Sequence, residues 1–346
     1  MIMKLYKQMK RGHWPSWLVA CFCLLVLAGC GGSSANQELV IYSSRTQSLV
    51  QPLLEQYAQQ TGTNIRVRYA STASLVATLL EEAQNSPADV LYLAEPSGWA
   101  ALSEAGLLSD LPDNLLEKVD DRFRSSQGEW VGTSGRSKVV VYNTENIVPE
   151  RDLPQSIMDF TDPKWKGRIG WAPTHGEWQI LLMAIRTEEG EEAARRWLEG
   201  IKANEPETYP NLISIVQAVA DGEVDVGFVN HYYVPRFIAE EGEDFRARNY
   251  YLGNGDPGAV VDVAGVAIHQ SSDLREAAEG FVEYMLDVEA QQYFAQETHE
   301  YPLSAGVPPA GDLPPLSSLD PPAIDPTELS ELESTLRLLR ETGVIP

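Results

Sequence analysis

The sequence has little cysteine, and none of it lies in the main part of the chain. All three cysteines, Cys21, Cys23 and Cys30, fall within the first 30 of 346 residues. The remainder has no thiol for a disulfide, a cysteine zinc site or a nucleophile. The sequence therefore excludes those chemistries from any folded domain after Cys30.

Basic residues are also scarce. The chain has 26 Lys and Arg against 50 Asp and Glu, and residues 1–29 hold four of the basic residues and none of the acidic ones. From Cys30 onward, 22 basic and 50 acidic residues give a net charge of −28. Such a charge argues against nucleic acid as a partner. It favours cations at the surface, although solubility or a saline environment explains it equally well.

The common enzyme motifs are missing. No P-loop is present, and no G-x-G-x-x-G follows the first predicted strand. Ser134 lies in Gly132–Arg136, but this segment does not have the G-x-S-x-G spacing, and no histidine–acid pairing follows it. We therefore expect a protein that is not an enzyme.

The N-terminus predicts export. Residues 1–13 carry four basic residues, an apolar run covers residues 17–28, and Leu27–Cys30 reads Leu-Ala-Gly-Cys. This is the pattern of a signal peptide over residues 1–29, and the alternative is an uncleaved membrane anchor. The Leu-Ala-Gly-Cys ending resembles the lipobox of bacterial lipoproteins, which implies lipidation of Cys30. Residues 30–36 then form a flexible tether.

After the tether, short apolar strands alternate with amphipathic helices. Strands are predicted at residues 39–42, 65–69 and 88–94, with helices between them, which favours a mostly parallel sheet covered on both faces. A second set of alternations begins near Lys138. It has strands at 138–142, 168–171, 224–229 and 260–268, and helices after His175, at 191–202 and at 274–294. The proline-rich residues 307–326 predict an irregular segment before a closing helix at 328–342.

Tyr232 and Tyr233 stand side by side where the strand at 224–229 gives way to a short helix. At a helix start, two neighbouring phenols can converge on one point, whereas on a strand they would face opposite sides. Phenolate is a hard oxygen donor that suits highly charged cations such as ferric iron. The alternative interpretation is that both rings only pack as amphipathic side chains.

Several ordered motifs resemble those of the periplasmic ferric-iron-binding proteins of bacterial ABC transporters, also called bacterial transferrins. The resemblance covers nearly all of the chain after the tether. The matching segments are Val40–Thr46, Ala88–Tyr92, Ser134–Asn143, Asp162–Thr174, Asn230–Tyr233 and Tyr301–Leu303.

This resemblance implies an α/β, two-lobed periplasmic binding protein fold with a hinged cleft between the lobes. Lobe 1 is expected from residues 37–136 and 264–306, lobe 2 from 137–263, and the proline-rich segment and C-terminal helix from 307–346. The implied function is capture of Fe(III) for an ABC importer with a membrane permease. The implied location is the periplasm or cell surface of a bacterium, where the protein is expected to act as a lipid-anchored monomer.

The resemblance also implies which residues bind. It makes Tyr232 and Tyr233 metal ligands, whereas Thr46 and Ala94 stand where many members have a ligating histidine and glutamate, with Glu95 one residue out of register. Members that lack those ligands use a synergistic carbonate or bicarbonate. The candidates to hold such an anion here are Arg45, Arg136, Gly176 and Asn230.

Three of these assignments leave alternatives open. His175 either ligates iron or hydrogen-bonds the anion, or has neither role. Arg45 and Arg136 alternatively form a surface or interlobe ion pair. Asn230 alternatively caps the helix that carries the tyrosines.

Two other functions fit the same sequence. The cleft alternatively binds an anionic or metal-chelate nutrient, with the arginines and helix N-termini taking the anion and the tyrosines lining the pocket. A third hypothesis is a lipid-anchored sensor or interaction subunit that uses the cleft to signal to a membrane partner.

Overall fold

The computed structural model describes residues 38–311, 313–324, 329 and 332–346. The predicted signal peptide, Cys30 and the tether lie outside these residues. Among the helices that are described, none has the length and apolar character needed to cross a bilayer.

The first lobe begins with the predicted β-α-β-α-β unit. It consists of β1 (Glu38–Ser43), α2 (Gln47–Thr61), β2 (Asn64–Tyr69), α3 (Thr72–Glu82) and β3 (Val90–Leu93). Strand β1 pairs in parallel with both β2 and β3, as a β-α-β unit requires. Helix α2 ends where Gly62 adopts a left-handed conformation with φ of 69°, which glycine enters without steric cost. Short helices α4 (Trp99–Glu104) and α5 (Asp113–Leu116) follow.

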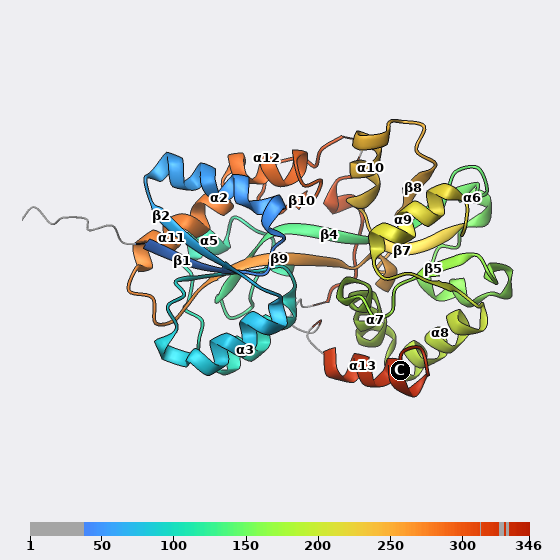
Figure 1. The fold of residues 1–346 in the computed structure, drawn as a ribbon, viewed down its shortest axis with the longest axis horizontal. Coiled ribbons are helices and arrows are strands. Elements are labelled where there is room, and N and C mark those ends of the chain that lie inside the picture. The colour runs from blue at the N-terminus through green and yellow to red at the C-terminus, as the bar shows by residue number, and fades with distance from the viewer. Residues whose placement is uncertain (1–37, 312, 325–328, 330–331) are drawn as a thin grey trace, which may run out of the picture. The chain divides into compact units, whose positions relative to one another are not determined.

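The sheet as a whole is mixed, so the expectation of a mostly parallel sheet was wrong. Strand β9 (Val261–Ile268) runs antiparallel to β3 and to the long β4 (Trp130–Asn143), and β10 (Tyr301–Pro302) is antiparallel to β4. The path through the sheet is β2-β1-β3-β9-β4-β7-β5-β6. Apolar runs predict that a strand is buried on both faces, but they carry no information about its direction. Figure 1 shows β4 and β9 side by side between the two halves of the fold.

The second lobe is built on the far half of β4. Strand β7 (Val226–Asn230) and strand β8 (Ala247–Tyr250) are antiparallel to β4, whereas β5 (Ile169–Trp171) is parallel to β7 and to β6 (Glu207–Thr208). The surrounding helices are α6 (Pro149–Asp152), α7 (Gly176–Glu189), α8 (Glu191–Ala203), α9 (Leu212–Asp221), α10 (Tyr233–Glu241) and α13 (Leu332–Glu341). The predicted helices after His175 and at 191–202 correspond to α7 and α8.

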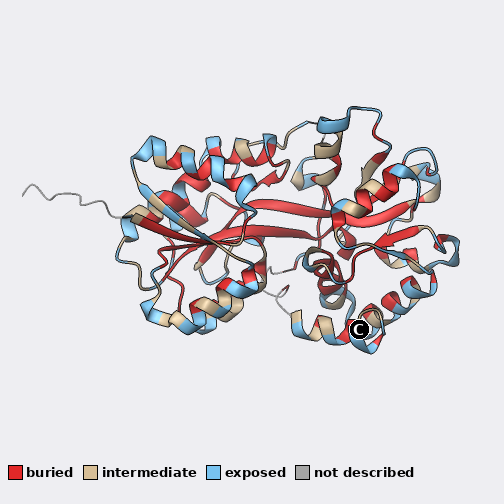
Figure 2. Ribbon diagram, in the orientation of Figure 1, coloured by how far each residue is buried: buried red, intermediate tan, exposed pale blue. Residues whose placement is uncertain are grey.

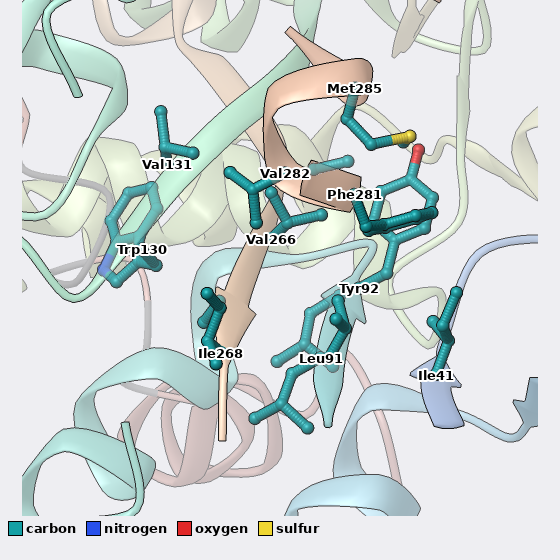
Figure 3. Close-up of a cluster of buried hydrophobic side chains, with 14 of the residues drawn as sticks. Ile41, Leu91, Tyr92, Trp130, Val131, Val266, Ile268, Phe281, Val282 and Met285 are labelled. Carbon is teal, nitrogen blue, oxygen red and sulfur yellow. The ribbon is translucent and has the colours of Figure 1, made fainter. Parts of the chain in front are cut away.

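Two separate hydrophobic cores define the lobes. One contains buried residues from 39–131 and 261–303, and Figure 3 shows part of it around Leu91, Trp130 and Phe281. The other contains buried residues from 139–259 together with Leu338 and Leu339 of α13. Strands β4 and β9 are buried almost throughout, as Figure 2 shows, because they run between these cores. The exact lobe boundaries stay a prediction.

The predicted helix at 274–294 was wrong in one respect, because the structure divides it into α11 (Arg275–Met285) and α12 (Val288–Gln296). Asp287 has extended backbone angles and interrupts the helix. Phe281 and Phe294 are fully buried in the same core. Both helices therefore bury apolar side chains in one core, and this shared burial hid the break from the sequence.

The proline-rich segment has the irregular structure that was expected. Its described residues contain one short 3-10 turn, at Leu316–Ser318, and otherwise no helix or strand. The closing helix is described as α13 (Leu332–Glu341), and it packs its buried Leu338 and Leu339 into the second core; the predicted start at residue 328 lies outside the described residues. The C-terminus is thereby attached to the second lobe.

Candidate metal centre

The two phenol groups converge at the start of α10. Strand β7 ends at Asn230, Tyr232 occupies the position before the helix, and Tyr233 is its first residue. The Tyr232 hydroxyl donates to the Tyr233 hydroxyl, with an oxygen–oxygen distance of 3.2 Å. The ring centroids are 4.4 Å apart. This separation lets one small cation contact both oxygens.

Both phenols are held in the protonated form. Burial, together with the negative charge of Glu177, raises the pKa of Tyr232 well above its ordinary value. Burial also raises the pKa of Tyr233. At neutral pH the pair is therefore neutral, and a metal would have to displace the phenolic protons in order to bind there.

Asn230 links the tyrosines to a buried charged cluster. Its amide nitrogen donates to the Glu177 carboxylate at 2.9 Å and to the Tyr232 hydroxyl at 3.3 Å, and its oxygen accepts from the Lys138 ammonium at 2.6 Å. The position before α10 is Tyr232, which makes no capping hydrogen bond through its side chain. Asn230 is thus occupied inside the site and does not cap the helix.

The charged cluster contains two cations and two carboxylates. Arg136 contacts Asp262 at 2.5 Å and Glu177 at 3.2 Å, while Lys138 contacts the same two carboxylates at 3.2 Å each. Arg136 also donates to the backbone oxygen of Ala94. Burial opposes the ionisation of Glu177, but Arg136 and Lys138 outweigh it and hold the pKa of Glu177 well below its usual range. The guanidinium that the sequence offers to an external anion is therefore already paired with carboxylates of the protein.

Arg45 is also paired with a carboxylate. It lies in the loop after β1, and its Nη2 donates to both oxygens of Glu300, at 2.8 and 2.7 Å. Ser134 donates to Glu300 as well, at 2.6 Å. The Arg45 Nε atom is buried and has no hydrogen-bond partner among the described residues. Most of the positive charge of Arg45 is thus neutralised within the first lobe.

His175 and Gly176 lie at the start of α7. His175 precedes the helix and Gly176 is its first residue. Burial lowers the pKa of His175, so that its imidazole is neutral at neutral pH. Its Nδ1 atom is buried without a hydrogen-bond partner in the described part of the chain. A neutral ring with a free nitrogen retains the capacity to bind a metal or an anion.

The residues at and beside the positions of the family's histidine and glutamate ligands make local contacts here. Thr46 precedes α2. The backbone nitrogen of Ala94 donates to Ser44 at 2.7 Å. Glu95 hydrogen-bonds Thr72, and its pKa is raised by burial and by the charge of Glu177. Glu95 therefore lies within the electrostatic reach of the cluster, although no contact joins it to the tyrosines.

Two further polar residues have local roles. The Asn211 oxygen accepts from the backbone nitrogen of Ser214 at 2.9 Å and caps α9. His231 is fully buried, accepts from the Ser137 backbone nitrogen at 3.1 Å, and stacks on Tyr301 with centroids 4.5 Å apart. The His231 and Tyr232 rings pack edge to face, with their centroids 5.8 Å apart. His231 thus packs between the rings of Tyr301 and Tyr232.

A cavity of about 340 Å³ opens between loops of the first lobe and helix α7. Its lining includes Ser44, Thr72, Glu95, Gly176, Gln179 and Leu329. In the described residues no group of three or more His, Cys, Asp and Glu side chains is arranged to hold a metal ion.

The sequence interpretation missed Lys138, Glu177, Asp262 and Glu300. Lys138 and Glu177 both occur in segments that the sequence singled out, but neither was given a role. Charged residues inside apolar runs, such as Lys138 before Val-Val-Val and Asp262 between valines, were the available signal, because a buried charge needs a partner.

Comparison with known proteins decides the family. Residues 53–318 match the family model described as bacterial extracellular solute-binding protein. The chain belongs to this family. It is 33% identical to the major ferric iron-binding protein of Neisseria meningitidis over 93% of this chain and 98% of that protein. It is 30% identical to the Fe(3+)-binding periplasmic protein of Serratia marcescens over 96% of this chain and 97% of that protein.

Solved structures give the same result for this solute-binding protein. The iron-bound HitA of Pseudomonas aeruginosa has a TM-score of 0.81 and 36% identity, over 88% of this chain and 99% of that chain. A Trichodesmium protein in complex with iron and citrate has a TM-score of 0.77 and 26% identity, over 89% and 99%. The predicted two-lobed fold, the extracytoplasmic solute-binding role and the resemblance to ferric-iron-binding proteins are thereby confirmed.

Proposed function

We propose that this protein is the substrate-binding component of a ferric iron ABC importer. It takes Fe(III) into the cleft between its lobes and delivers it to a membrane permease. The observation that carries the proposal is the pair of phenol oxygens of Tyr232 and Tyr233, 3.2 Å apart at the start of α10. The names of the Neisseria and Serratia relatives, which describe ferric iron binding, support it.

The chemistry of the pair suits this cargo. Phenolate is a hard, anionic oxygen donor, and ferric iron is a hard cation that binds such donors strongly. Burial keeps both phenols protonated. A cation therefore binds here only if it polarises the phenol oxygens strongly enough to displace their protons. Tyr232 and Tyr233 thus select for a strongly polarising ion.

Two phenolates leave ferric iron with one uncompensated positive charge, so the site needs a further anionic oxygen donor. The carbonate-type anion suggested by the sequence, held by Arg45, Arg136, Gly176 and Asn230, stays a prediction. Of these four, Arg136 and Asn230 lie together around one carboxylate, that of Glu177. His175 remains a candidate ligand through its free nitrogen.

A chelated form of iron is the second candidate cargo. The Trichodesmium protein holds iron together with citrate and has the same fold. A citrate carboxylate would supply the missing anionic oxygens in the same way as carbonate. The nutrient taken up is then a ferric chelate, and the tyrosines keep their role as ligands.

We also propose that Cys30 anchors the protein, as a monomer, to a bacterial membrane in the periplasm or at the cell surface. Each buried methylene of a lipid chain contributes about 0.8 kcal/mol, and more than one chain gives stable retention. Replacing Cys30 by alanine should release the protein from the membrane fraction. Identical partitioning of wild type and Cys30→Ala would contradict the anchor.

We propose no catalytic role for the site. Ser134 is the residue with superficial resemblance to a hydrolase nucleophile, and its hydroxyl donates to Glu300, a carboxylate that is already paired with Arg45. A serine nucleophile needs a base that accepts its proton and is itself oriented by a third group.

Addition of ferric citrate to the purified protein, with and without bicarbonate, tests the function. The proposal expects a visible phenolate-to-iron charge-transfer band at about one iron per protein, since two adjacent phenolates bind one ion. Gallium, which has the same charge and no such band, should compete for the site. Absence of the band in both buffers would contradict the proposed cargo.

A further inference from the structure

The carboxylate of Glu177 is held at three points by groups from two other elements. Arg136 and Lys138 of β4 contact it at 3.2 Å each, and Asn230 at the end of β7 donates to it at 2.9 Å. A bound carbonate or carboxylate ligand is held in the same way, by guanidinium, ammonium and amide donors placed around one planar oxyanion. Here a side chain of the protein occupies that place.

The same carboxylate borders the tyrosine pair. The Asn230 amide nitrogen bridges the two groups, because it donates both to Glu177 and to the Tyr232 hydroxyl, the latter at 3.3 Å. Burial first, and then the negative charge of Glu177, raise the pKa values of both phenols.

The two carboxylates of the cluster differ in position. The Asp262 side chain is completely buried on β9, whereas the Glu177 side chain keeps 12% of its surface exposed. Asp262 contacts both cations, as Glu177 does, so Arg136 and Lys138 each keep one buried carboxylate partner that is independent of Glu177. Glu177 comes from α7 of the second lobe, beside Gly176, which lines the interlobe cavity. Of the two carboxylates, Glu177 is therefore the one that is partly exposed and that Asn230 links to Tyr232.

We propose that Glu177 is the anionic oxygen donor of this site, and that it completes the coordination of ferric iron beside Tyr232 and Tyr233 in place of an external carbonate. Arg136, Lys138 and Asn230 orient its carboxylate, as they would a free oxyanion. The two phenolates and the Glu177 carboxylate then supply three anionic oxygen donors to the ion, while Asp262 remains paired with Arg136 and Lys138. The inference rests on the proposed function, and it predicts that iron binding does not depend on bicarbonate.

The test uses the purified protein and iron supplied as ferrous sulfate, which oxygen free of carbon dioxide oxidises in place, so that neither an organic chelator nor air provides the anion. The charge-transfer band is titrated in bicarbonate-free buffer and again with ¹⁴C-labelled bicarbonate. Affinity comes from competition with a fixed chelator, and retained label from desalting. Wild type should bind equally well in both buffers and retain almost no label.

Two substitutions of Glu177 separate the effect of its negative charge from the effect of its side-chain volume. Glu177→Ala should bind iron about tenfold or more weakly without bicarbonate, because a charge-assisted ligand is lost. Bicarbonate should restore its binding and leave about one labelled anion per iron, since Arg136, Lys138 and Asn230 then face an open site of carbonate size. Glu177→Gln fills the same space without the charge. Its iron binding should therefore be weakened, and bicarbonate should not restore it.

Glu188→Ala is the matched control, because this residue is exposed near the far end of the same helix. It should behave as wild type. Thermal unfolding of each apo variant verifies that the fold is intact, and the bicarbonate rescue of Glu177→Ala excludes misfolding directly.

Two results would overturn the inference while leaving the function in place. One is a wild-type protein that requires bicarbonate and retains one labelled anion per iron. The other is a pair of Glu177 variants that bind iron as wild type does without bicarbonate, in which case Glu177 only forms an ion pair. Absence of the band from wild type in every buffer would instead overturn the proposed function itself, and the inference with it.

Discussion

Arg45 donates through one guanidinium nitrogen to both carboxylate oxygens of Glu300, a residue 255 positions later in the sequence. Both side chains are almost completely buried. The pair ties the loop after β1 to the residue that precedes β10, and both segments belong to the first lobe. This geometry favours a structural role for Arg45 over the anion role that the sequence suggests.

Removing one partner of this buried pair should be costly. Glu300→Gln leaves the Arg45 charge uncompensated, which typically costs about 3–5 kcal/mol of unfolding free energy. Urea denaturation of the apo protein measures this cost. The control is Glu38→Gln, because its pair with Arg66 is exposed and should contribute less than about 1 kcal/mol. Near-wild-type stability of Glu300→Gln combined with weak iron binding would instead support the anion role of Arg45.

The folded state should lose stability in acid because of His231. Burial lowers the pKa of this imidazole to about 3, from an ordinary value of 6.5. Between these values the unfolded chain binds a proton that the folded protein does not, so stability falls as pH drops below 6.5 and no such loss occurs above it. One proton corresponds to a slope of about 1.4 kcal/mol per pH unit.

Comparison with His231→Asn isolates this contribution, because the variant keeps a hydrogen-bond acceptor for Ser137 but does not titrate. Unfolding free energies from pH 8 to pH 4 should decline more steeply for wild type than for the variant below pH 6.5. The other histidines with lowered pKa values are common to both proteins and cancel. Parallel curves over the whole range would show that His231 is not buried in the neutral form.

Much of the architecture could be predicted from the sequence. Apolar runs and helical periodicity gave β1 to β3, α7, α8 and β7, and the abrupt change from strand to helix at Asn230–Tyr233 predicted where the phenols converge. Strand direction was beyond such patterns, as the mixed sheet shows. The break at Asp287 was also hidden, because α11 and α12 bury their apolar faces in one core.

The charged part of the site could not be predicted for a different reason. Which carboxylate pairs with Arg45 or Arg136 depends on contacts such as Arg136–Asp262, 126 residues apart, which no local pattern records. The sequence thus pointed to Arg45, Arg136 and the two phenols, whereas Lys138 and the three carboxylates that neutralise the cations emerged only from the fold.

Iron binding should close the cleft and stabilise the protein. The proposed ligands lie in the second lobe, and Arg136, which contacts Glu177, also donates to the backbone oxygen of Ala94 in the first lobe, so the closed form should bind better. At a free iron level of 100 times Kd, the expected stabilisation is about 2.7 kcal/mol. Solution scattering should show a smaller radius of gyration, and the unfolding temperature should rise. An unchanged profile and melting temperature on loading would contradict ligand-driven closure.

The most direct test of the central claim is the charge-transfer band of the Tyr232→Phe, Tyr233→Phe double variant. Phenylalanine keeps the ring packing and deletes both donor oxygens, so the apo fold should be preserved while the band and high-affinity iron binding disappear. Each single variant should retain a weaker band. Tyr251→Phe is the control, because this partly buried tyrosine packs against the second core and is not a proposed ligand. Full iron binding by the double variant would contradict the assignment of Tyr232 and Tyr233 as the ferric ligands.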